Sequence, residues 1–120
     1  MPIEKAQESL RAAELCFGEL LYNSTANRAY YAMFQAAVVA LARAGVLPTG
    51  EGWSHDGLRS TVARVLIQQR KLYKKELATF LAEGLWIRNR ADYRDQMISE
   101  QQARRMVQRA RAWLAAVERG

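Results

Sequence analysis

Residues 88–95, RNRADYRD, place three arginines, two aspartates and a tyrosine directly after an apolar stretch. Arg88 lies two helical turns after Leu81, so the spacing predicts that its side chain points along the stripe of core leucines. A buried guanidinium is costly unless it is paired, and Asp92 stands one turn further on, with the Tyr93 hydroxyl nearby. The residues therefore predict an inward Arg88–Asp92 ion pair. The alternative is an exposed pair at a helix end, worth under about 1 kcal/mol.

A second polar set interrupts an apolar segment. Between residues 29 and 42 every residue except Gln35 is aromatic, aliphatic or alanine. This predicts a helix at the centre of a bundle or against a second subunit. Arg28, Tyr31 and Gln35 are spaced so that their polar ends share one face of that helix. The alternative is that Arg28 reaches water from the helix start and that Tyr31 is an amphipathic core residue.

His55 is the only histidine and follows Ser54, which can cap a helix. At the first position of a helix the positive helix end favours a neutral imidazole, which suits hydrogen bonding or proton transfer. The alternative is an exposed loop histidine. One histidine and one cysteine exclude a cluster rich in these ligands, so we expect no metal and no cofactor. The sequence has no glycine-rich phosphate loop and no nucleophile elbow.

Helical periodicity accounts for nearly all of the chain, and no stretch alternates convincingly with a period of two. The connections are short apart from a loop at 45–53, GVLPTGEGW, so consecutive long helices are expected to be antiparallel neighbours. We predict an all-α fold, an up-and-down antiparallel bundle of four to five helices, in one domain of residues 1–120. Five helices are predicted. The first covers about residues 3–22, the second runs from a cap at 23–25 to about 44, and the third covers about 55–68. The fourth follows a basic connector and ends near 91–93, and the fifth runs from a capping box at Ser99 to about 118.

The last predicted helix carries an apolar stripe on one side and arginines on the other. The stripe is expected to face the core, and it consists of Ala103, Met106, Val107, Ala110, Trp113 or Leu114, and Val117. Arg104, Arg105, Arg109 and Arg111 lie mostly off this stripe. We interpret them as a solvated face, and only secondarily as a phosphate-binding one.

The charge of the chain is uneven. The formal net charge is +6, and all of the basic excess lies after residue 22. Such a charge is compatible with phosphate contact, although it bears on solubility more than on function. The longest apolar run, AAVVALA at 36–42, is too short to span a bilayer, so we expect a cytoplasmic protein with no membrane contact. Cys16 is expected to be a small buried hydrophobe.

Four segments together resemble the HEPN domain, a helical bundle of prokaryotes and higher eukaryotes. In order over about 90 residues, they are NRAYYAMFQAAVVALARAG at 27–45, SHDGL at 54–58, RNRADY at 88–93 and SEQQARRMVQRARAWL at 99–114. The resemblance implies a bundle of four or five helices, often a homodimer. It also implies pairing with a minimal nucleotidyltransferase, the two forming a toxin and antitoxin in many relatives.

The resemblance bears on catalysis as well. Catalytic members of the family are metal-independent ribonucleases whose motif is an arginine, commonly a polar residue next, and then a histidine. Arg88 and Asn89 match the beginning of this motif, but Tyr93, Arg94 or Asp95 fills the histidine position. This departure removes the group that exchanges a proton with the ribose hydroxyl or the leaving oxygen.

Three hypotheses follow. The first is a HEPN-type dimer that acts with a nucleotidyltransferase and binds the phosphate of a nucleotide or RNA in a polar cleft of Arg28, Tyr31, His55, Arg88, Asp92 and Tyr93. The second is an active ribonuclease toxin that uses Arg88 with His55 or Tyr93. The third is a bundle whose polar cluster only fixes helix register and dimerisation. Gly84, one turn before Arg88, permits close approach of another backbone and also favours self-association.

Overall fold

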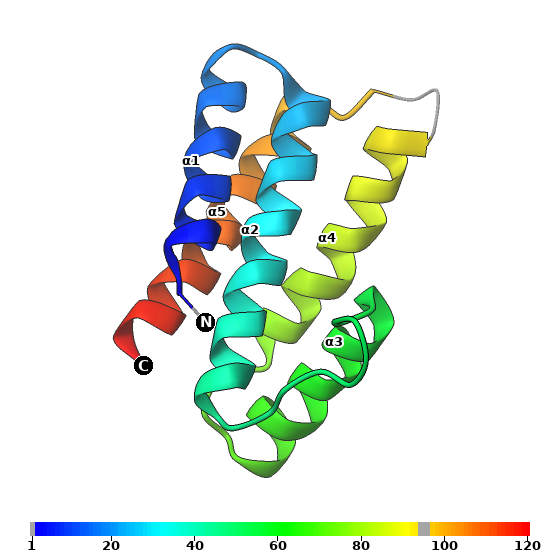
Figure 1. The fold of residues 1–120 in the computed structure, drawn as a ribbon. Helices are drawn as coiled ribbons and strands as arrows, with labels where there is room; N and C mark the ends of the chain where they lie inside the picture. Colours follow the sequence, from blue (N-terminus) through cyan, green and yellow to red (C-terminus); the bar gives the residue numbers. More distant parts are fainter. Residues whose placement is uncertain (1, 94–96) are drawn as a thin grey trace.

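The computed structural model describes residues 2–93 and 97–120, with only the backbone at Tyr93. Within these residues the fold is all-α, without strands. Figure 1 shows the four long helices running alternately up and down, which confirms the predicted bundle. The helices are α1 (Glu4–Gly18), α2 (Tyr22–Arg43), α3 (His55–Thr61), α4 (Glu76–Tyr93) and α5 (Glu100–Arg119), and a π-helical segment, η1 (Val62–Gln69), continues α3.

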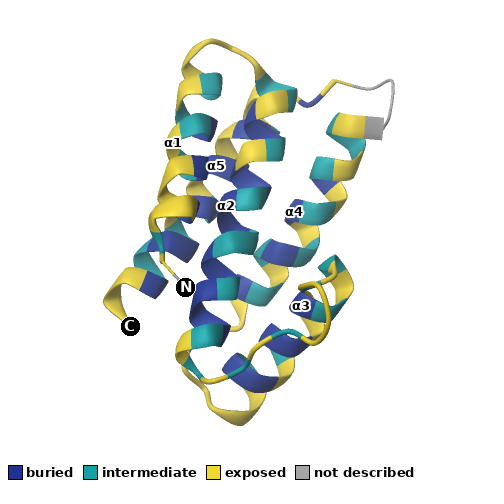
Figure 2. Cartoon of the chain, viewed as in Figure 1, coloured by how far each residue is buried: buried dark blue, intermediate teal, exposed yellow. Residues whose placement is uncertain are grey.

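The helix α2 lies at the centre of the bundle and contacts every other helix. Its apolar composition follows from this position, because no side of the helix is left wholly to water. Figure 2 shows buried residues along most of α2, while the turns and the 45–53 loop are mostly exposed. A central helix was one of the two predicted positions for this segment, and the structure confirms it within a single chain.

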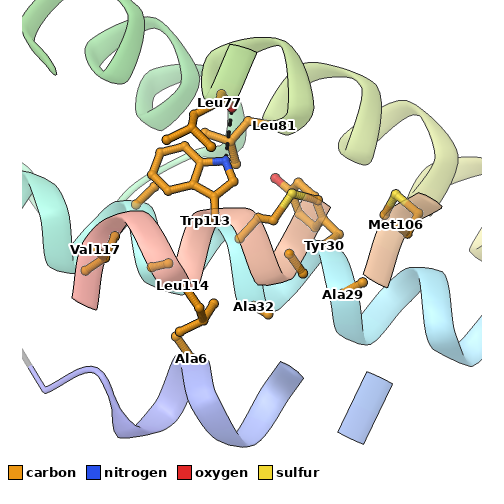
Figure 3. Packing of buried hydrophobic residues seen from close by; sticks show 14 of the residues in the cluster. Ala6, Ala29, Tyr30, Ala32, Leu77, Leu81, Met106, Trp113, Leu114 and Val117 are labelled. Carbon is orange, nitrogen blue, oxygen red and sulfur yellow. Dashed lines mark hydrogen bonds between the residues drawn. The ribbon is translucent and has the colours of Figure 1, made fainter. Parts of the chain in front are cut away.

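The inward stripe of α5 is buried along its whole length, as its spacing predicts. Trp113 is fully buried, and its Nε1 donates a hydrogen bond of 3.0 Å to the Leu77 carbonyl oxygen, which fixes α5 against the first turn of α4. Figure 3 shows this indole between Leu77 and Leu81, with Val117 and Leu114 on the same helix. The contact buries a large aromatic surface without leaving its N–H unpaired.

Two predicted helix starts are confirmed by their side-chain caps. Ser54 Oγ accepts a hydrogen bond of 2.9 Å from the Gly57 amide at the start of α3. Ser99 and Gln102 form a reciprocal capping box at the start of α5. Such caps satisfy amide groups that a helix cannot pair internally.

The turn between α1 and α2 differs from the prediction. The helix α1 ends at Gly18 rather than near residue 22, because Leu20 adopts a left-handed conformation (φ 63°) in a Schellman turn. In this turn the Leu21 amide donates a hydrogen bond of 2.9 Å to the Cys16 carbonyl oxygen. Leu20 and Leu21 lie in this turn and are 67% and 55% exposed. The next helix starts at Tyr22 without the side-chain cap predicted at 23–25.

Gly84 packs against side chains of α2 in the same chain. A Cβ at this position would lie 2.8 Å from Met33 Cε and 3.4 Å from a Tyr30 ring atom, so the absent side chain makes room for α2 residues. Side chains of the same chain, and not another backbone as predicted, thus occupy the space beside Gly84. Neither Gly84 nor the apolar α2 requires a second subunit.

Across residues 2–93 and 97–120, no helix combines the length and the hydropathy needed to cross a membrane.

Candidate functional site

Arg88 lies on the side of α4 that faces α2, and only 14% of its side chain is exposed. Its Nε is 3.0 Å from Asp92 Oδ2, and its Nη2 donates a hydrogen bond of 3.2 Å to the Tyr31 hydroxyl. Arg88 therefore points inward and its predicted pair with Asp92 is confirmed, while Asp92 itself lies in the last turn of α4 and is exposed. The pair positions one guanidinium against the central helix of the bundle.

The ring of Tyr31 lies close to two guanidinium groups. Arg28 Cζ is 5.3 Å from the ring centroid and Arg88 Cζ is 5.4 Å from it. Both contacts are within the range of cation–π attraction. The Tyr31 ring therefore brings two like charges near one another, and Asp92 pairs with one of them, Arg88. The sequence predicts Arg28, Tyr31 and Arg88 in one polar cleft.

Asn27 completes the cluster and was missed by the sequence analysis. Its Nδ2 donates a hydrogen bond of 2.8 Å to Asp92 Oδ2. Its Oδ1 accepts hydrogen bonds of 3.2 Å and 2.7 Å from Arg28 Nε and Nη2. Asn27 stands four residues before Tyr31 and so shares its helix face, which was the available signal. The amide connects the arginine of α2 to the ion pair of α4. We refer to Asn27, Arg28, Tyr31, Arg88 and Asp92 as the arginine cluster.

A small crevice of about 310 Å³ adjoins the arginine cluster. Apart from the thiol, its lining groups are polar or charged: Cys16, Asn23, Ser24, Asn27, Arg28 and Asp92. Cys16 is only partly buried here, so the prediction of a buried hydrophobe at this position is wrong. The crevice places amide, hydroxyl and guanidinium donors around one space.

His55 docks onto α2 and is not an exposed loop residue. Its Nδ1 lies 2.7 Å from the Tyr30 hydroxyl, and its ring packs 5.5 Å and 5.4 Å from the rings of Tyr30 and Phe34. Burial raises the pKa of Tyr30 to about 12, so its hydroxyl keeps its proton at neutral pH. The hydroxyl therefore keeps its hydrogen bond with Nδ1, in a direction set by the tautomer of the imidazole.

The predicted site residues fall into separate groups. Among described residues, the contacts of His55 run to α2 and those of Arg88 to Tyr31, Asn89 and Asp92, and none joins the imidazole to this guanidinium. The prediction that Gln35 shares the helix face of Arg28 and Tyr31 is wrong. Gln35 Oε1 instead accepts a hydrogen bond of 2.7 Å from the Ser9 hydroxyl of α1.

Three positions of the motif cannot be placed. The side chain of Tyr93 and all of Arg94 and Asp95 lie outside the described residues. Tyr93 therefore stays a prediction as a site residue.

The arginines of α5 lie outside the core, as predicted, but several have partners. Arg104 lies 3.6 Å from Glu100, Arg109 is paired with Glu83 of α4, and Arg111 is 2.7 Å from Glu14 of α1. The pairs of Arg109 and Arg111 join α5 to α4 and α1, whereas the Arg104–Glu100 pair lies within α5. The arginine cluster differs from them because it gathers two guanidinium groups around a single tyrosine ring.

The chemistry available to the arginine cluster is oxyanion binding. Planar guanidinium groups bind carboxylate or phosphate oxygens with two parallel hydrogen bonds. With two arginines and one aspartate, the cluster keeps a formal charge of +1. In the described part of the chain, no group of three acidic, histidine or cysteine side chains is placed to hold a metal ion.

Comparison with protein families gives one match. The model of the HEPN domain family matches residues 2–120. A search of curated proteins found no match.

Proposed function

The chain belongs to the HEPN domain family, and on this premise we propose that its arginine cluster binds the phosphate of a nucleotide or of RNA. The proposal includes action as the partner of a nucleotidyltransferase in a toxin–antitoxin-like module. It extends the family assignment, which by itself gives the domain and not the ligand.

The observation that carries the proposal is the two-arginine contact around Tyr31. Arg88 is largely shielded from water and is held at Nε by Asp92 and at Nη2 by Tyr31. A guanidinium fixed in this way loses little side-chain freedom on binding. Less of the free energy of each hydrogen bond to phosphate is therefore lost in ordering the side chain, and the affinity is higher. Arg28 is exposed and borders the crevice, where an incoming phosphate has access to it.

The matched test compares Arg88→Ala with Arg104→Ala. Both arginines pair with an acidic residue one helical turn away, but Arg104 is 56% exposed and Arg88 only 14%. We expect Arg88→Ala to weaken binding of a labelled short single-stranded RNA by about tenfold or more, measured by fluorescence anisotropy. Arg104→Ala is expected to weaken it by no more than about twofold. Equal losses would mean that binding is diffuse electrostatics and that the cluster only packs α4 against α2.

The protein partner is the second part of the proposal, and the family resemblance is its source. Exposed leucines at the α1–α2 corner, Leu15, Leu20 and Leu21, support it because they offer apolar surface for contact with another chain. Co-expression with a small nucleotidyltransferase encoded beside this chain should yield a complex. That complex is expected to be lost in Leu20→Lys and retained in Leu47→Lys, a change of another exposed leucine. Failure of the two proteins to co-purify would contradict the proposed nucleotidyltransferase partner.

Self-association is a third part, again implied by the family. Sedimentation of the purified chain at micromolar concentration is expected to give a dimer. A monomer at that concentration would contradict it.

The ribonuclease remains the rival function. The His55–Tyr30 hydrogen bond favours it, because it holds the imidazole beside the helix face that carries Tyr31. The separation of His55 from the Arg88 contacts favours binding without cleavage.

A further inference from the structure

A second cavity, of about 800 Å³, lies at the opposite end of α2 from Arg28. It is formed where α2 and α5 finish, beside the first turns of α4, and no member of the arginine cluster lines it. Its volume falls within the range of about 300–1,000 Å³ typical of small-molecule sites.

The floor of this cavity is apolar and aromatic. Ala40 and Leu77 are buried there, and the Tyr73 ring stacks on Trp113 with centroids 6.2 Å apart and an interplanar angle of 30°. Trp113 is itself fixed by its hydrogen bond to the Leu77 carbonyl oxygen, visible in Figure 3. The floor is therefore formed by packed core residues and exists before any ligand arrives.

The rim of the cavity is cationic. Arg43, Lys74 and Arg119 line it together with one acidic residue, Glu76. Arg43 Nη1 donates 2.7 Å to the Val117 carbonyl oxygen, which holds the guanidinium at the edge of the space. Within residues 2–93 and 97–120, no carboxylate forms an ion pair with Arg43.

The Tyr73 hydroxyl belongs to the same side of the cavity. Burial raises the pKa of Tyr73, and the nearby charge of Arg43 partly offsets that effect. A hydrogen-bonding hydroxyl and a guanidinium thus converge at the edge of an apolar floor.

We propose that this cavity binds a small amphipathic anion, with its apolar body on the Tyr73–Leu77 floor and its anionic group at Arg43. Charge complementarity selects the anion, because three basic side chains and one acidic side chain line the cavity. The apolar floor selects a ligand with a hydrocarbon body over a bare ion. The site is independent of the arginine cluster and of any RNA bound there.

Three probes separate the two parts of this recognition. Calorimetric titration of the full chain with decanoate is expected to saturate at one molecule per chain. Decan-1-ol lacks the charge and inorganic phosphate lacks the hydrocarbon, so each is expected to bind at least about tenfold more weakly. Equal binding of decanol, equal binding of phosphate, or no binding of decanoate would each overturn the proposal.

Variants locate the bound decanoate. Arg43→Gln is expected to weaken binding by about tenfold, whereas Arg43→Lys keeps most of it because the charge remains. Arg105→Gln is the control, since Arg105 stands 14 residues before Arg119 on α5 and hence about 21 Å away along the helix. Ala116→Leu fills the cavity and is expected to abolish binding.

Two results would contradict this location. One is an equal effect of Arg43→Gln and Arg105→Gln, and the other is unchanged binding in Ala116→Leu. Thermal melts check that each variant is folded. If Arg43→Gln does not fold, the contrast between Arg43→Lys and Ala116→Leu decides the question.

Discussion

The Nη2 group of Arg88 donates a hydrogen bond of 3.2 Å to the hydroxyl of Tyr31, joining α4 to the central helix of the bundle. The same tyrosine ring lies under the Arg28 guanidinium. One side chain therefore sets the positions of two cations that come from different helices. This relationship supports the proposed oxyanion binding at the arginine cluster and distinguishes its arginines from those on α5, which pair with acidic residues.

The Tyr31 hydroxyl is expected to matter for ligand binding beyond the ring that carries it. Tyr31→Phe keeps both cation–π contacts and removes the acceptor for Arg88, so RNA affinity should fall by about three- to tenfold. Tyr22→Phe is the control, because the Tyr22 hydroxyl makes only a bond of 3.4 Å to Glu100. Anisotropy titrations measure both. No loss in Tyr31→Phe would mean that Arg88 does not need this bond to bind phosphate.

RNA cleavage by the purified chain is expected to be absent. His55 is bonded to Tyr30 and makes no described contact with Arg88, and a tyrosine with an ordinary pKa near 10 is a poor base at neutral pH. The chain should therefore cleave labelled RNA no faster than its Arg88→Ala variant. Cleavage that is lost in both Arg88→Ala and His55→Ala, and that persists with a metal chelator, would make the ribonuclease the leading function.

Stability is expected to fall in alkaline solution through Tyr30. Folding raises the pKa of this acid from 10.0 to about 12, so between these values the unfolded chain releases a proton that the folded chain retains. The unfolded state then binds fewer protons, and the free energy of unfolding decreases as pH rises, by a total on the order of 2 kcal/mol. Below this window both states are protonated and the contribution is constant.

Tyr30→Phe isolates that effect from other alkaline titrations. The variant loses the hydrogen bond to His55 at every pH, but it has no hydroxyl at position 30 whose ionisation could lower the stability at alkaline pH. Urea unfolding from about pH 9 to about pH 11.5 should bring the stability of the wild type closer to that of the variant. Parallel pH profiles of the two proteins would contradict the raised pKa.

Trp113 and Trp86 provide a paired test of the core. Trp113 is fully buried, whereas Trp86 is 58% exposed and stacks with Arg90 at 4.7 Å. Trp113→Ala is expected to cost about 3–5 kcal/mol of unfolding free energy. Trp86→Ala should cost no more than about 1 kcal/mol, the size of an exposed cation–π contact. Similar losses in denaturant unfolding would show that the Trp113–Leu77 contact does not anchor α5.

Side-chain periodicity predicted the parts of the fold that depend on local rules. The apolar stripe of α5, the caps at Ser54 and Ser99, and the Arg88–Asp92 pair all follow from spacing within one helix or at its end. The family resemblance agreed with these features over the same segments.

Features that depend on tertiary approach were not predictable in the same way. The left-handed Leu20 turn occurs at a leucine, without the glycine that usually marks it. Asn27 gains its role only when α4 brings Asp92 beside it, and Gln35 turns to α1 because Ser9 is buried there. The docking of His55 depends on the path of the 45–53 loop, which no periodic pattern describes.

The central claim is that phosphate binds at Arg28 and Arg88, and the arginine Nε–Hε signals of the folded chain report on it directly. In an NMR titration with a short single-stranded RNA, the signals of Arg28 and Arg88 are expected to shift together and saturate. The signals of Arg104 and Arg111, paired on the α5 surface, should change little. An unchanged Arg88 signal, or equal shifts of all four arginines, would contradict the account.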